Sequence, residues 1–120
     1  MTDTRNTRGS LNASGRRRML ATIVAALGSD CAACGRETIA NGGANDGRTL
    51  QLGHVESAAN GGRFVIHNLL PICARCNAFM GDRDWSASGA PMRVTPLPTG
   101  TRMLPDPGTV RTHFDAPAWA

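Results

Sequence analysis

The chain has 120 residues and a net charge of +4, and all thirteen of its basic residues are Arg. A chain of this length forms one domain with a modest core, and such domains often depend on a metal or a disulfide. No apolar run is long enough to cross a bilayer, and the first residues lack the apolar middle region of a signal peptide. We therefore expect a soluble cytoplasmic protein with no membrane partner, where paired cysteines usually bind metal.

The first half of the chain predicts a helix followed by a hairpin. Residues 1–14 are polar and are expected to form a flexible basic arm. Apolar residues at helical spacing between Met19 and Leu27 predict a helix that Ser14 caps and Gly28 ends. Downstream we expect a loop, a strand, a turn and a short return strand at 36–47, 48–55, 60–62 and 63–66, respectively.

The second half predicts one helix and a long tail. The helix is expected to begin at 71–73, to run to Met80 and to end at Gly81. From Ser86 onward the chain holds six of its seven prolines, so we expect an extended tail that either wraps the domain or stays mobile. The expected organisation is an arm, a folded domain and a tail, at 1–14, 15–85 and 86–120.

Four cysteines form two Cys-x-x-Cys pairs, Cys31 with Cys34 and Cys73 with Cys76. Two intervening residues allow a tight turn or a first helical turn to direct both thiolates at one ion, and Gly35 suits such a turn. The alternatives are a disulfide and a thioredoxin-like redox motif, but the strand and helix context of the redox motif is absent. We therefore predict a structural zinc with four thiolate ligands.

The 38 residues between the pairs exceed the insert of a simple zinc ribbon. In this insert His54 lies in an apolar strand, a Gly-Gly turn follows, and Asn68 precedes the second pair, which Asn77 follows. In order and spacing, residues 31–82 resemble the HNH endonuclease family in its zinc-bearing, small phage or bacterial form. The resemblance implies a small α+β fold: a treble-clef ββα-metal domain with a structural four-cysteine zinc, here with an N-terminal helix and an extended Pro-rich C-terminal tail.

The resemblance assigns a role to each matching residue. His54 matches the general base, which deprotonates water for attack on a phosphodiester, and imidazole titrates near neutral pH. Asn68 matches the central Asn, whose amide bonds backbone groups and fixes the imidazole. Asn77 matches a ligand of the catalytic ion, which would be Mg²⁺, Mn²⁺ or Ni²⁺. Taken singly, each would be an ordinary strand, turn or helix residue, so the hypothesis rests on their joint placement.

One position departs from the family pattern. The residue before the base is usually an Asp or His that helps to hold the catalytic ion, whereas this chain has Gly53. A substitute acid could be Glu56, which alternation places on the face of His54, or the more distant Asp82 or Asp84. Otherwise Asn77, water and DNA phosphates hold the ion, or the nuclease is degenerate.

Arginines are expected to contact DNA, because guanidinium groups pair well with phosphate oxygens. The candidates are Arg16, Arg17, Arg18, Arg63, Arg75 and Arg83. No segment is typical of base reading, so low sequence preference is expected. The alternative is that some of these charges only keep a small domain soluble.

Two functional hypotheses follow. The first is a metal-dependent DNA endonuclease that nicks DNA as a monomer or cuts both strands as a dimer. The second is a degenerate, zinc-stabilised DNA-binding or assembly module, based on Gly53. The resemblance also suggests a phage setting, with phage packaging (terminase) proteins as partners in the host cytoplasm.

Overall fold

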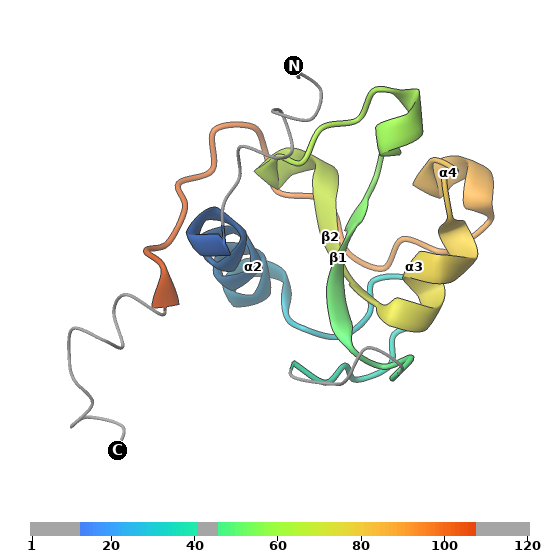
Figure 1. Cartoon of the computed structure of the whole chain (residues 1–120), viewed down its shortest axis with the longest axis horizontal. Helices are drawn as coiled ribbons and strands as arrows, with labels where there is room; N and C mark the ends of the chain where they lie inside the picture. The colour runs from blue at the N-terminus through green and yellow to red at the C-terminus, as the bar shows by residue number, and fades with distance from the viewer. Residues whose placement is uncertain (1–12, 41–45, 108–120) are drawn as a thin grey trace.

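The computed structural model describes residues 13–40 and 46–107, which form a small α+β unit (Figure 1). A two-stranded antiparallel sheet pairs β1 with β2. Helix α2 lies on one side of this sheet, and α3 with α4 lies on the other. In chain order the elements are α2 (Ala13–Leu27), β1 (Leu50–His54), η1 (Ala58–Asn60), η2 (Ile66–Asn68), β2 (Leu69–Cys73), α3 (Ala74–Met80) and α4 (Trp85–Ser88).

Helix α2 buries the apolar face that the periodicity predicted. Met19 and Ile23 are buried in a cluster with Ile66 and Leu69. The helix ends at Gly28, as expected, because this residue has a φ of 88° and donates its N–H to the carbonyl of Val24 at 2.9 Å. The cap assignment was wrong: Ser14 lies inside the helix. The predicted arm lies outside the described residues up to position 12.

Both strands of the sheet come from the region between the two cysteine pairs and the start of the second pair. Their antiparallel register pairs Gly53 with Leu70 and His54 with Leu69. Leu69 packs against α2 on one face, while Leu70 and Ile72 join the cluster around the cysteines and Trp85. All three leucine and isoleucine side chains of β2 are fully buried. The connection between the strands, residues 55–68, therefore begins and ends at a well-packed sheet.

The return strand lies later than predicted. Residues 63–65 form a turn in which Val65 donates its N–H to the carbonyl of Arg63, so they do not pair with β1. The paired strand is Leu69–Cys73 and contains Pro71. Proline is tolerated there because each strand of a two-stranded sheet is an edge strand. The second helix accordingly starts at Ala74, after the predicted start, and ends before Gly81, as predicted.

The C-terminal segment crosses back over the domain as far as the described residues reach, at position 107 (Figure 1). Arg93 donates its backbone N–H to the carbonyl of Ala32 at 2.8 Å. Arg17 makes a bidentate ion pair with the buried Asp106, with contacts of 2.8 and 2.7 Å. Of the two behaviours left open for the tail, this described part wraps the domain.

None of the helices in the two described ranges has both the length and the apolar character needed to cross a bilayer.

Candidate functional site

The four cysteines converge from two distant segments. Their sulfur atoms all lie within 4.8 Å of one another. A tetrahedral zinc with Zn–S bonds of about 2.3 Å would place its ligands roughly 3.8 Å apart. The cluster therefore fits one metal ion such as zinc. Within the described residues, no other group of three or more His, Cys, Asp or Glu side chains has metal-binding spacing.

Backbone N–H groups surround these sulfurs. Ala33 and Cys34 donate to Sγ of Cys31, and Cys76 donates to Sγ of Cys73, each at 3.4 Å. Burial raises the pKa of the Cys31 thiol, but backbone hydrogen bonds outweigh it and the pKa falls to about 7. Burial, and after it the thiol of Cys31, raises the pKa of Cys73, and burial together with the neighbouring thiols raises the pKa of Cys76. Four thiolates this close repel one another, and a divalent cation removes that cost.

The tail reinforces the first cysteine turn in a way that the sequence did not reveal. Gly35 has a φ of 81° and donates its N–H to the carbonyl of Cys31 at 2.8 Å. A Cβ at this position would lie 3.1 Å from Nε of Arg93. That Nε donates to the carbonyl of Ala33 at 3.1 Å. Arg93 therefore holds the metal-binding turn from sixty residues away along the chain.

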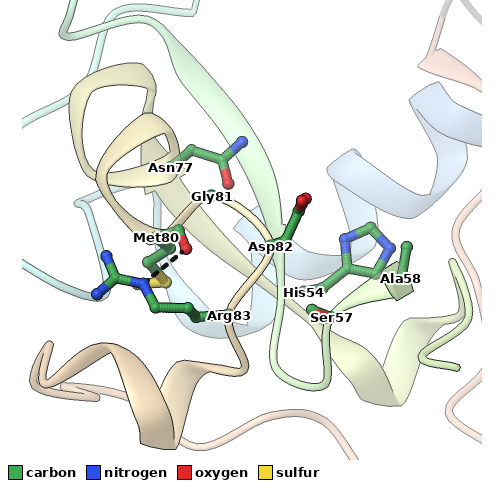
Figure 2. A pocket seen from close by; sticks show the side chains of 8 residues that line it. All are labelled: His54, Ser57, Ala58, Asn77, Met80, Gly81, Asp82 and Arg83. Atoms are coloured by element: carbon green, nitrogen blue, oxygen red, sulfur yellow. Dashed lines mark hydrogen bonds between the residues drawn. The ribbon is translucent and has the colours of Figure 1, made fainter. Parts of the chain in front are cut away.

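A second site lies beside the sheet, where His54 and Asn77 line one pocket of about 100 Å³ (Figure 2). The other lining residues are Ser57, Ala58, Met80, Gly81, Asp82 and Arg83. The structure thus brings together the predicted base and the predicted ligand of the catalytic ion, which are 23 positions apart in sequence.

His54 is the last residue of β1 and is half-buried. Its ring meets the ring of Phe64 edge to face, with centroids 5.7 Å apart, and its Nε2 atom is buried. Such packing limits the rotamers open to the imidazole and so holds the ring at the end of β1, where the connection to β2 begins. His67 is exposed on η2 and does not line the pocket, and His113 lies outside the described residues.

Asn68 is buried and closes the loop that follows His54. Its Oδ1 accepts the N–H of Glu56 at 2.8 Å, and its Nδ2 donates to the carbonyls of Glu56 and Arg63 at 3.0 Å. A Cβ on Gly62 would lie 1.8 Å from the Glu56 oxygen. Gly62 is therefore required for this bridge, while Gly61 supplies the left-handed turn with a φ of 97°.

Asn77 lies on α3 and donates its Nδ2 to Oε1 of Gln51 at 2.8 Å. Figure 2 shows its side-chain oxygen turned towards Asp82. Because Gln51 holds the nitrogen, the amide oxygen is the atom left to face a ligand in the pocket. An amide oxygen is a suitable ligand for a hard divalent cation.

Position 53 is tightly packed against Ile72. A Cβ on Gly53 would lie 3.0 Å from Cγ2 and 3.3 Å from Cδ1 of the fully buried Ile72. Glu56 is exposed and is not among the residues that line the pocket, since β1 ends at His54 and strand alternation does not extend to it. The pocket carboxylate among the described residues is that of Asp82.

The predicted DNA-contacting arginines are scattered. Arg17 is paired with Asp106, and Arg18 donates to the carbonyl of Leu104 at 3.0 Å. Arg83 lines the pocket, donates to the carbonyls of Phe79 and Met80, and stacks over the Phe79 ring at 4.9 Å. Arg18 is half-buried, and the other five arginines are exposed.

No family model, curated protein or solved structure matches the chain.

Proposed function

We propose that the protein is a metal-dependent DNA endonuclease of HNH type, built on a treble-clef ββα-metal domain with a structural zinc. The observation that carries the proposal is the convergence of His54, from the end of β1, and Asn77, from α3, on one pocket. Two members of the four-cysteine cluster, Cys73 and Cys76, lie directly before Asn77 in the chain. The residue types, their order in the chain and their convergence on one pocket all support a site of HNH type.

Each side chain has a defined task in this proposal. His54 removes a proton from the attacking water, and its packing against Phe64 holds the ring in place. Asn68 acts as a positioning residue, because it fixes the loop that follows His54 through three hydrogen bonds. Asn77 offers its amide oxygen to a Mg²⁺, Mn²⁺ or Ni²⁺ ion, which would offset charge on the phosphate.

DNA would bind mainly through its phosphates, with low sequence preference. Arg83 lies in the pocket wall, where its guanidinium is held by backbone carbonyls and by stacking on Phe79. A guanidinium held in this way is suited to a phosphate oxygen. A phage role with packaging (terminase) proteins in the host cytoplasm is part of the proposal and rests on the family resemblance alone.

A second candidate is a zinc-stabilised DNA-binding or assembly module without catalysis. Gly53 favours it, because the usual ligand position carries no side chain and is packed tightly against Ile72. This candidate predicts DNA binding that falls steeply with salt and no cleavage with any divalent ion.

The test is a supercoiled-plasmid assay with zinc-loaded protein and added Mg²⁺, Mn²⁺ or Ni²⁺. We expect nicking by the wild type, loss of nicking in His54→Ala, and retention in His67→Ala. The His67 variant is a matched control, because it removes an exposed imidazole that does not line the pocket. Zinc content should be equal in all three proteins. No cleavage by a zinc-loaded wild type that still binds DNA would favour the module.

A further inference from the structure

The proposed catalytic ion lacks a carboxylate ligand at position 53, where this chain has Gly53. Magnesium and manganese prefer carboxylate oxygens and are usually held by one or two of them, together with water and substrate phosphates. Gly53 has no side chain to offer, and a Cβ there would already lie 3.0 Å from Cγ2 of Ile72 in the buried cluster. A carboxylate in this pocket must therefore come from another element.

The acidic residues near the pocket differ in whether their carboxylates are already hydrogen-bonded and in whether they line the pocket. Asp84 uses its carboxylate to accept from the N–H of Ser57 at 2.8 Å and from Nδ2 of Asn60 at 3.0 Å, so it holds the loop before η1. Glu56 and Asp82 are both exposed, but Glu56 does not line the pocket. Asp82 lines the pocket with His54 and Asn77.

The turn after α3 explains how Asp82 reaches this place. Gly81 ends the helix with a φ of 57° and donates its N–H to the carbonyl of Asn77 at 3.2 Å. Arg83 then donates its N–H to the carbonyl of Met80 at 3.0 Å, which closes the turn. In the view of Figure 2, the Asp82 carboxylate projects between the amide of Asn77 and the imidazole of His54.

We propose that Asp82 is the carboxylate ligand of a hard divalent cation in this pocket and replaces the ligand that the family carries at position 53. The inference rests on the proposed function for its catalytic meaning, but the metal site itself can be tested without DNA. Asp82 would supply one carboxylate oxygen and Asn77 one amide oxygen. The remaining positions would take water or a DNA phosphate, which leaves the ion accessible to a substrate.

The experiment measures Mn²⁺ binding to zinc-loaded protein by calorimetry and by the electron paramagnetic resonance signal of free Mn²⁺. Asp82→Asn keeps the size of the side chain and removes its charge. Glu37→Gln, an exposed carboxylate outside the pocket, is the matched control for net charge. Glu56→Gln tests the rival acid. The same proteins are then assayed for plasmid nicking.

We expect Asp82→Asn to weaken Mn²⁺ binding at least about tenfold, because even groups behind a metal ligand change affinity by that much. Zinc content should not change, and both glutamate variants should bind as the wild type does. Absence of Mn²⁺ binding by the wild type, or equal binding by Asp82→Asn, would overturn the proposal. So would lost nicking with unchanged affinity, because Asp82 would then orient His54 instead. Asp82-dependent Mn²⁺ binding without any nicking would support the metal site while refuting the nuclease.

Discussion

The amide of Asn68 is the contact whose removal gives the sharpest prediction. Asn68→Ala deletes three hydrogen bonds of 2.8, 3.0 and 3.0 Å to the backbone of Glu56 and Arg63. Each is worth about 0.5–1.5 kcal/mol net. All three bonds are part-buried, so the released backbone groups are only partly shielded from water, and we expect a total loss of about 2–3 kcal/mol.

Such a loss is a large part of the roughly 5–15 kcal/mol that stabilises a typical domain. Urea denaturation of zinc-loaded protein, followed by circular dichroism, measures it. A loss below about 1 kcal/mol would show that the bridge does not hold the loop. Nicking should fall more than stability does, since the loop follows directly after His54.

Gly62→Ala provides an independent test of the same bridge. Its methyl group would lie 1.8 Å from the Glu56 oxygen, and a backbone atom cannot move aside as a side-chain end can. Gly61→Ala is the matched control, because a Cβ there meets nothing within 4 Å and its positive φ alone costs about 1–2 kcal/mol. Gly62→Ala and Asn68→Ala should together cost less than their sum. Full additivity, or a Gly62 variant no less stable than the Gly61 variant, would refute the reasoning.

Cys76→Ser should abolish tight zinc binding and cooperative unfolding, because structural zinc contributes directly to folding. If elemental analysis still finds one zinc per chain in this variant, the four-thiolate site is contradicted. Gly53→Ala should lower the free energy of unfolding by about 1–3 kcal/mol through overpacking against Ile72. In an Ile72→Ala background the same substitution should cost clearly less. Equal costs in urea denaturation would mean that Ile72 does not crowd this position. The side chain of Asn60 and a backbone N–H hold the pKa of Asp84 below its usual 3.8. The resulting stabilisation is therefore present above pH 3.8 and is lost as the pH falls through the lowered pKa. Asn60→Ala should raise this pKa in an NMR titration, and an unchanged value would exclude the contact as its cause.

Features with a short-range cause were predictable from the sequence. The periodicity from Met19 to Leu27 matched a helix, and Gly28 and Gly81 marked helix ends because glycine adopts positive φ without strain. The spacing within each Cys-x-x-Cys pair predicted sulfur atoms that converge on a metal, and the four sulfurs do lie together. Neighbours in sequence decide the helix ends and the turn within each cysteine pair, whereas the meeting of the two pairs depends on the fold.

The strand that returns to β1 shows where local patterns fail. Residues 63–66 include Phe, Val and Ile, which favour strands, whereas Pro71 suggested the start of a helix. The observed strand is nevertheless Leu69–Cys73, because that register buries Leu69, Leu70 and Ile72 completely. Burial across two faces of a sheet outweighs propensity, and it depends on partners distant in sequence.

The sequence by itself determined the chemistry available to this protein: four thiols in two pairs, an imidazole, and amides at fixed intervals between them. Tertiary structure alone decided which of these groups meet. It packed Ile72 tightly against position 53, left Glu56 outside the pocket, and turned Asp82 into it through Gly81. Local rules specify turns and helix faces, but the occupancy of a pocket follows from strand register and close packing, which only the folded chain defines.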